Sequence, residues 1–396
     1  KAANGVIVIT TKKGQRGQMS LNYAGSFTTS VRMNYDKLEI MNSKERVDLS
    51  REGYRRGAKM PKETIGYTGL ALAYERGEIG LEEFSEKVKE LETTNTDWFD
   101  ILCRDALSHN HSLSVSGGSA NARYYASFGY GNDQGEIRGE KNERYTASVR
   151  VTVQHKKFQM QFGMSGNVQD KLYNPSGLGI MNYAYNMTRA IPLRLENGEL
   201  YTYEKKNQPF NIVREMEESE YTIAQKSASV NAQVQYRVSE ALKLVGTASY
   251  SMGTSDDNTW YGENSNYILQ LKNTGNSMKQ SKCPFGGELK TNSTRNSSYM
   301  LRLQSDYSRY WDKNKNHFTN ASIGYEVSSS TYRGTANTER GYYKNRGMGF
   351  ASFGDGDYSN YPDYYNWMIG NNPKYTKSLT NTMSAYLTLT YSYKDR

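Results

Sequence analysis

The segment from residue 142 to residue 165 constrains the fold more than any other part of the chain. Apolar side chains occupy every second position of its first half, namely Tyr145, Ala147, Val149, Val151 and Val153, and of its second half, namely Phe158, Met160, Phe162 and Met164. A period of two predicts strands with two unlike faces, and the polar turn at 155–157 joins them into an antiparallel hairpin. Each arm has about ten alternating residues, against roughly five or six in a typical strand and roughly nine to eleven in a strand that crosses a bilayer at a tilt. We interpret the hairpin as membrane wall.

The composition argues against a soluble enzyme with a conventional core. Only 36% of the 396 residues are hydrophobic, and the mean hydropathy is −0.83, whereas soluble domains are roughly 45–50% apolar. A transmembrane barrel needs apolar side chains only on its lipid face. The 34 tyrosines suit the aromatic girdles of such a barrel. The chain has no apolar run of about 18 residues, so transmembrane helices are not predicted.

The charges and thiols point to no further class of site. The net charge is +9, but lysines and arginines are scattered along the chain, so no nucleic-acid partner is predicted. In an outer membrane these cations would meet lipid phosphates or an anionic substrate. Cys103 and Cys283 lie far apart in the sequence; free thiols are favoured over a disulfide, and both remain open.

Connections of two lengths alternate along the chain. About ten wall strands are predicted, and a helix is predicted around Leu81, Phe84, Val88 and Leu91 within the first long connection. Short turns are expected near 117–121, 155–157, 239–241, 311–316 and 394–396, and long connections at 29–107, 131–142, 168–222, 253–295 and 329–378. Outer-membrane barrels place short turns in the periplasm and long loops outside, so the asymmetry predicts an orientation.

Four sequence motifs carry a resemblance to a known family. The apolar run GVIVITTKKG near the start reads as a strand buried on both faces. It is followed by TDWFD from Thr96, NHSLSVSGG from Asn110 and RYYASFGY from Arg123. Together these motifs resemble the SusC/RagA family of TonB-dependent outer-membrane transporters.

The resemblance implies an all-β fold, an antiparallel transmembrane β-barrel of twenty-two strands with an N-terminal plug domain and long extracellular loops that carry short helices. Residues 1–16 would be the C-terminal end of the plug and residues 17–396 the N-terminal part of the barrel, with about ten strands. No signal peptide is visible at Lys1, and the pattern is already under way there. We therefore expect an internal segment of a longer protein.

The resemblance also implies a function. Members of this family import nutrients actively, most often oligosaccharides and sometimes peptides. A SusD-like surface lipoprotein closes the barrel, and the TonB–ExbB–ExbD complex acts through an N-terminal region that would precede this segment. A multi-pass location in the bacterial outer membrane, in contact with its lipids, is implied. The alternatives are a siderophore or cobalamin receptor, a passive porin, and a soluble carbohydrate-binding β protein.

The sequence offers candidate binding residues but no catalytic ones. GxxxxGK[ST], GxSxG and HExxH are absent, so we predict neither an enzyme nor a cofactor. His109 and His111 share a strand face but lack a third ligand nearby, and Asp355, Asp357 and Asp363 do not match a calcium loop, so no metal is predicted. Aromatic side chains that could stack on cargo cluster in two loops: Trp260, Tyr261, Tyr267, Tyr364, Tyr365 and Trp367. The alternatives are that these rings pack the loops against each other or mark the membrane rim.

Overall fold

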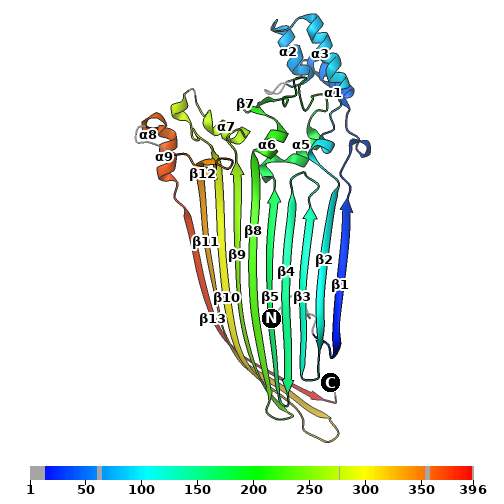
Figure 1. Cartoon of the computed structure of the whole chain (residues 1–396), viewed down its shortest axis with the longest axis vertical. Coiled ribbons are helices and arrows are strands. Elements are labelled where there is room, and N and C mark those ends of the chain that lie inside the picture. The colour runs from blue at the N-terminus through cyan, green and yellow to red at the C-terminus, as the bar shows by residue number, and fades with distance from the viewer. Residues whose placement is uncertain (1–13, 60–64, 276, 353–356, 395–396) are drawn as a thin grey trace.

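One large antiparallel sheet dominates the computed structural model, which describes residues 14–59, 65–275, 277–352 and 357–394. Its strands follow one another in chain order, each paired with the next long strand (Figure 1). The ten long strands are β1 (Gly17–Ser30), β2 (Ala106–Gly118), β3 (Ala122–Gln134), β4 (Lys141–His155), β5 (Phe158–Tyr173), β8 (Ser219–Arg237), β9 (Leu242–Tyr261), β10 (Gly287–Tyr310), β11 (His317–Tyr343) and β13 (Lys374–Tyr393). The short β12 (Gly349–Phe350) also pairs with β11, while β6 (Tyr203–Lys205) and β7 (Gln208–Phe210) form a separate hairpin.

The register of β4 and β5 confirms the predicted hairpin. Val149 lies opposite Met164 and Val151 opposite Phe162 on one face, and Ser148 lies opposite Ser165 on the other. The hairpin closes through Lys156, whose φ of 50° is the left-handed conformation that tight two-residue turns require. Between Tyr145 and Val153 one face of this pair of strands is therefore apolar and the other polar.

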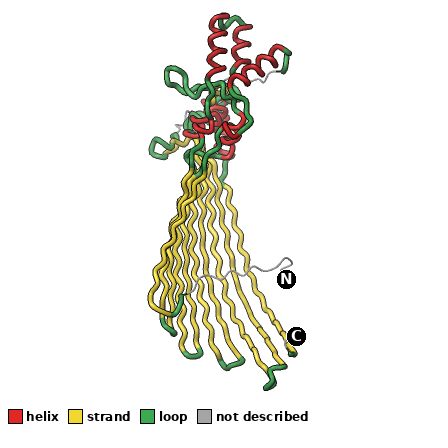
Figure 2. The backbone as a smooth tube through the Cα atoms, turned by 90° about the vertical axis from the view of Figure 1, so that its right-hand side faces the viewer, coloured by secondary structure: helices red, strands yellow, loops and turns green. Residues whose placement is uncertain are grey.

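The two ends of the sheet differ, as the alternating connection lengths predict. Tight turns lie at one end, and all the helices gather at the other (Figures 1 and 2). The described helices are α1 (Ser43–Arg55), α2 (Tyr67–Glu75), α3 (Leu81–Thr93), α4 (Trp98–Leu102), α5 (Ile180–Asn186), α6 (Ile212–Glu217), α7 (Asn266–Lys272), α8 (Asp357–Asn360) and α9 (Pro362–Gly370), with 3-10 turns η1 (Tyr35–Lys37), η2 (Ser176–Leu178) and η3 (Met278–Gln280). In the described ranges, no helix is both long and apolar enough to cross a membrane.

Helix α3 confirms the helix predicted around Leu81 to Leu91. Its Val88 packs with Val47 of α1 in a small core that stands apart from the sheet. The sequence analysis did not predict α1 or α2. The start of α1 carries a capping box, in which Asn42 and Glu45 each bond the other's backbone N–H, and this local signal would have located it.

The main hydrophobic core lies among the loops at the helical end rather than within the sheet. Trp98 and Phe99 of α4, in the TDWFD motif, are buried there with Ile191 and Ile212 from later connections. The Trp98 indole Nε1 donates a hydrogen bond to the Thr188 carbonyl at 3.0 Å. The motif thus ties the first long connection to the loop that follows β5.

Several strands run further into the predicted loops than the sequence analysis placed them. The connections predicted at 131–142, 253–295 and 329–378 shrink because β3 continues to Gln134, β9 to Tyr261 and β11 to Tyr343. In these extensions polar and charged side chains occupy both faces, so the apolar alternation stops while the backbone pairing continues. Residues 1–13 of the predicted plug segment lie outside the described residues.

The two outermost strands have a free edge. Among the described residues β1 pairs only with β2, and β13 only with β11. Both strands carry exposed apolar side chains: Leu21 on β1 is 65% exposed and Leu387 on β13 is 72% exposed. An unpaired apolar edge of this length is unusual in water, because it offers a row of free N–H and C=O groups to other chains.

The exposed apolar side chains on the face that carries Val149 form a band, which we call the apolar band, and this band crosses the sheet obliquely. Tyr130, Tyr145 and Val168 are directly opposite one another, and continuing along the same row of paired residues leads to Arg295 and Lys377 on the same face. On β13 the main run of apolar positions lies further toward the tight turns, at Met383, Leu387, Leu389 and Tyr391, while Leu379 and Tyr375 are separate exposed apolar side chains on either side of Lys377. When strands are tilted at 35–45° in a membrane, a band parallel to the membrane shifts by roughly one residue on each successive strand, measured against the rows of directly paired residues. The main run of apolar positions shifts in this direction and by about this amount.

Candidate functional site

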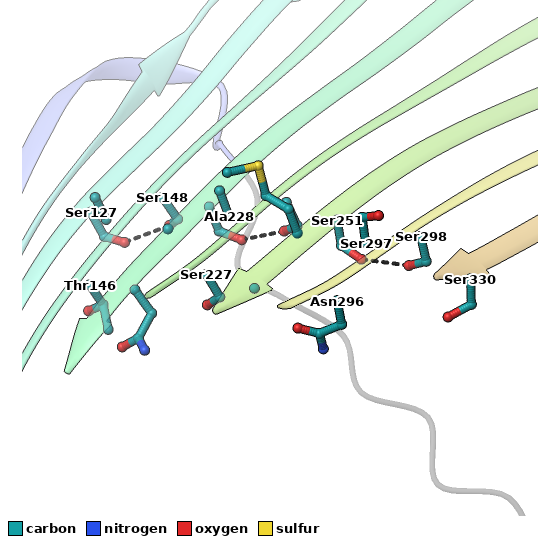
Figure 3. Close-up of a pocket in the computed structure, with 17 residues that line it drawn as sticks. Ser127, Thr146, Ser148, Ser227, Ala228, Ser251, Asn296, Ser297, Ser298 and Ser330 are labelled. Carbon is teal, nitrogen blue, oxygen red and sulfur yellow. Dashed lines mark hydrogen bonds between the residues drawn. The ribbon is translucent and has the colours of Figure 1, made fainter. Parts of the chain in front are cut away.

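The face opposite the apolar band carries a continuous row of hydroxyl side chains, which we call the serine row. Its eight serines lie directly opposite one another on eight neighbouring strands: Ser114, Ser127, Ser148, Ser165, Ser229, Ser251, Ser298 and Ser330. Asn22 on β1 and Thr380 on β13 extend it to both edges of the sheet. Three pairs are hydrogen-bonded at 2.8 Å: Ser127 with Ser148, Ser165 with Ser229, and Ser251 with Ser298 (Figure 3).

A cavity of about 560 Å³ follows the serine row across β3 to β11. Thr146, Asn167 and Asn296 line it beside the serines (Figure 3). Because each hydroxyl can both donate and accept a hydrogen bond, such a wall solvates sugars, peptide groups or water equally well. The row supplies no group that would act as a general acid or base at neutral pH.

A buried ion pair joins two strands where they enter the loops. The Glu288 side chain on β10 is fully buried, and its Oε2 lies 2.7 Å from Nε of Arg340 on β11. Lys290 Nζ approaches the other carboxylate oxygen at 3.2 Å. Arg340 also donates from Nη1 to the Lys282 carbonyl at 3.0 Å. Because the carboxylate is out of water, these partners are what keep it stable there.

The predicted aromatic residues gather around this ion pair. The Tyr267 hydroxyl donates to Glu288 Oε1 at 2.9 Å, and its ring centroid lies 4.6 Å from that of Tyr261. Trp367 lies under the Arg340 guanidinium, 4.0 Å from ring centroid to Cζ. The structure therefore brings the two aromatic loops together, although no sequence pattern indicates that they meet.

The remaining predicted residues occupy different environments. Tyr364 is buried and its ring centroid lies 5.9 Å from that of Trp367. Trp260 is also buried, beneath Lys344 with Nζ at 4.6 Å from its ring centroid. Tyr365 is exposed. Binding of cargo by these rings stays a prediction, and Trp260, Tyr261, Tyr267, Tyr364 and Trp367 are seen to pack against neighbouring side chains.

Glu288 and Arg340 were missed because each looks like an ordinary charged residue at the end of a strand pattern. Their partners come from residues 282, 267 and 367, which are distant in sequence. The only local signal is that Glu288 follows two glycines, Gly286 with a φ of 55° and Gly287, whose missing side chain lets the Tyr261 backbone approach. Only the folded loops bring the two charges together.

Burial raises the pKa of two loop side chains near this pair. Loss of solvation, followed by the neighbouring Glu288 carboxylate, raises the pKa of Tyr267 to about 12. Burial also raises the pKa of Cys283 to about 11. Cys103 and Cys283 are both free and buried, so the open question of a disulfide resolves in favour of free thiols. A thiol with a raised pKa is a poor nucleophile at neutral pH.

The histidine pair on β2 belongs to an aromatic group. His109 and His111 have ring centroids 5.2 Å apart, and Nδ1 of His111 lies 2.6 Å from the Tyr23 hydroxyl. Phe27 and Tyr130 flank them. The described part of the chain contains no group of three His, Cys, Asp or Glu side chains placed to hold a metal.

A buried carboxyl connects α6 to α7 in the loop layer. Glu215 is buried and its Oε1 accepts a hydrogen bond from the Asn266 backbone N–H at 2.8 Å. Burial outweighs this hydrogen bond and raises the pKa of Glu215 to about 7. The folded loops therefore hold a proton that the unfolded segment releases near pH 4.5.

This proton predicts that the loop layer loosens as the pH rises. Because the pKa is raised on folding, the stabilisation is complete below about pH 4.5, decreases as the pH approaches 7 and is lost above it, with a total of up to about 3 kcal/mol. Amide hydrogen exchange of residues 205–217 and 262–273, corrected for intrinsic rates, should show lower protection at pH 8 than at pH 5. Glu215→Gln should abolish the difference, and Glu217→Gln, at an exposed position of the same helix, should retain it. Equal protection at both pH values in the unmodified protein would contradict the assignment.

No family model matches this chain. It is 35% identical over 153 residues to the TonB-dependent receptor SusC of Bacteroides thetaiotaomicron, a stretch covering 38% of this chain and 12% of that protein. It is 25% identical over 146 residues to the TonB-dependent receptor P26 of Formosa agariphila, covering 37% of this chain and 12% of that receptor. The aligned stretches are thus a small part of these relatives.

The fold is shared with solved structures of a RagAB peptide importer. In its closed-closed and open-open states the TM-score is 0.71 at 18% identity, over 99% of this chain and 42% of the matched one. A structure of the RagAB peptide transporter gives a TM-score of 0.70 at 19% identity, over 100% of this chain and 43% of the other. These likenesses confirm the resemblance to SusC and RagA and the predicted antiparallel wall, and the chain corresponds to less than half of such a structure.

Proposed function

We propose that this chain forms part of the wall of an importer in the bacterial outer membrane, which takes up oligosaccharides or peptides with energy delivered through TonB. The oblique apolar band is the observation that supports the membrane placement most directly. A soluble β protein has no reason to align exposed apolar side chains along a line that slants across its pairing rows as tilted membrane strands require. The likeness to TonB-dependent receptors supports active import driven through TonB as the class of transport.

The two faces of the wall have separate tasks in this proposal. The apolar band contacts lipid, and the serine row faces the interior, where its hydroxyls replace water around a polar solute. The free edges of β1 and β13 pair with further strands, because an unpaired backbone group in the hydrocarbon costs several kcal/mol. The same resemblance supports a SusD-like surface lipoprotein that covers the helical end.

Energised uptake tests the proposed activity. In the producing bacterium, removal of the gene is expected to abolish uptake of at least one labelled oligosaccharide or peptide fraction, and its return should restore uptake. A protonophore should stop uptake in the restored cells, because TonB-dependent import uses the proton gradient. Uptake that continues without the proton gradient would indicate a passive pore. A protein that stays monodisperse in buffer without detergent would instead support the soluble carbohydrate-binding alternative.

Protease treatment of intact cells tests the orientation. The loop between β9 and β10, residues 262–286, and the loop between β5 and β8, residues 174–218, should be cut, because both lie at the helical end. The turn at Lys156 and Lys157 should be spared until the cells are opened. Fragments mapped by mass spectrometry give the result directly. Cleavage at this turn in intact cells, with both loops left whole, would reverse the orientation.

A further inference from the structure

Four cations lie along one row of paired residues on the face that carries the apolar band. Arg295 on β10 is directly opposite Arg333 on β11, which is directly opposite Lys377 on β13. On the other side the row passes through Thr254 on β9 to Lys226 on β8. We call these four residues the cation row. All four side chains are exposed.

The cation row has no anionic partner within the described chain. No ion pair or hydrogen bond involves its side chains, in contrast to Arg302 on the opposite face of the sheet, which pairs with Glu326. Two exposed carboxylates, Asp170 and Asp256, lie diagonally beyond the row toward the loops; neither forms an ion pair with it, and Asp256 accepts a hydrogen bond from Ser293. Like charges that face one another directly across strands destabilise a sheet. Three adjacent cations with no carboxylate in ion-pair contact therefore favour an anion from outside.

The position of the row indicates which anion is available. Lys226 lies two residues beyond Ala228, and Arg295 four residues beyond Tyr299, at the helical end of the apolar band. At about 3.3 Å per residue these positions are roughly 7–13 Å along the strand from the band. The polar headgroup layer adds roughly 5–8 Å to each side of the hydrocarbon core, and long basic side chains bend toward the phosphate level. Lys226 thus stands level with lipid headgroups, and because the row follows the pairing direction it rises from there through Arg295 and Arg333 to Lys377.

We propose that the cation row binds the phosphate groups of an anionic lipid in the outward-facing leaflet. Arg295 and Arg333 present guanidinium groups that bind phosphate oxygens in pairs, and the two lysines add charge on either side. The bound lipid neutralises the repulsion along the row and fixes the height of the wall in the membrane. This inference rests on the proposed membrane placement and adds a ligand to it that is independent of cargo.

Lipid binding to the purified, delipidated complete protein tests the proposal. The probes are lipid A with both phosphates, the same lipid after phosphatase treatment, and inorganic phosphate. Binding is read by native mass spectrometry and by the rise in thermal unfolding temperature. Each basic residue near an anionic surface contributes roughly fivefold in affinity. The quadruple variant Lys226→Gln, Arg295→Gln, Arg333→Gln, Lys377→Gln should therefore bind the phosphorylated lipid at least tenfold more weakly.

A matched variant separates this site from general attraction between charges. Replacement of four lysines by Gln in the turns at the opposite end, namely Lys156, Lys157, Lys313 and Lys315, changes the net charge equally and should leave lipid binding unchanged. Equal weakening in both variants, or equal binding by the quadruple variant and the unmodified protein, would overturn the proposal. If inorganic phosphate raised the unfolding temperature as much as the phosphorylated lipid does, the site would bind free phosphate, and the proposal that a lipid supplies the phosphate would be wrong. If the unmodified protein fails to insert into phosphatidylcholine vesicles, the membrane placement itself is wrong. If the unmodified protein and the quadruple variant both insert and bind the lipid equally, only the proposed role of the cation row is wrong.

Discussion

Arg340→Ala is expected to destabilise the loop layer by about 3 kcal/mol, at the lower end of the cost of removing one member of a buried ion pair. The change leaves the fully buried Glu288 carboxylate with Lys290 at 3.2 Å and the Tyr267 hydroxyl at 2.9 Å as partial compensation. Trp367 loses the guanidinium that lies on its ring. Denaturant titration of the complete protein in detergent, followed by tryptophan fluorescence, should show an early transition in the loops.

A neighbouring exposed ion pair provides the control for this prediction. Arg346 and Glu263 lie 3.3 Å apart with side chains 68% and 38% exposed. Arg346→Ala should change loop stability by less than about 1 kcal/mol, because exposed pairs contribute little. The double variant Glu288→Gln, Arg340→Ala should recover part of the lost loop stability, because no buried carboxylate is then left without its arginine partner. Equal effects of Arg340→Ala and Arg346→Ala would mean that the buried pair does not hold the loops.

Val149→Arg should destabilise the protein in lipid by about 2–4 kcal/mol, the cost of a basic side chain on the lipid face near the bilayer midplane. Val149 lies in the middle of the apolar stretch of β4, between Tyr145 and Val153, and faces Ala126 and Met164 on the neighbouring strands. Its side chain would be surrounded by hydrocarbon. Folding yield and urea stability of the complete protein in phosphatidylcholine vesicles measure the effect.

The matched substitution is one residue away on the other face. Ser148→Arg places the same side chain beside the cavity of about 560 Å³ that follows the serine row. Because that face is polar and has room, the expected loss is below about 1 kcal/mol. If Ser148→Arg proves the more harmful of the two, the serine row faces lipid and the assignment of faces is reversed.

The wall could be predicted from the sequence because its signal is local. The alternation of Val149 and Phe162 with Ser148 and Ser165 indicates both faces of this hairpin, and no other strand is needed to predict them. The ends of the strands could not be predicted. Beyond Gly253 the chain reads Thr, Ser, Asp and Asn on both faces, although β9 continues to Tyr261. Backbone hydrogen bonds maintain the strand there. Because they do not depend on the hydropathy of the side chains, the sequence pattern does not reveal them.

The arrangements that carry the inferences about sites depend on register, which a single sequence does not disclose. Ser148 and Ser298 are separated by 150 positions, and only the pairing of five successive strands places them in one row. The same holds for Arg295 and Lys377 in the cation row. The aromatic loops could be found from composition, but the Glu288–Arg340 pair that joins them required the folded loops.

The slant of the apolar band also determines how the hydroxyls are distributed in depth. On β3, Ser127 lies between Ala126 and Phe128 in the middle of the band, whereas on β13 Thr380 lies beyond Met383, outside the main run of apolar positions. In the proposed membrane placement, the serine row therefore rises obliquely from mid-membrane toward the outer rim and does not form a level ring. A polar solute that moved from one hydroxyl to the next in such a wall would follow a helical path about the barrel axis.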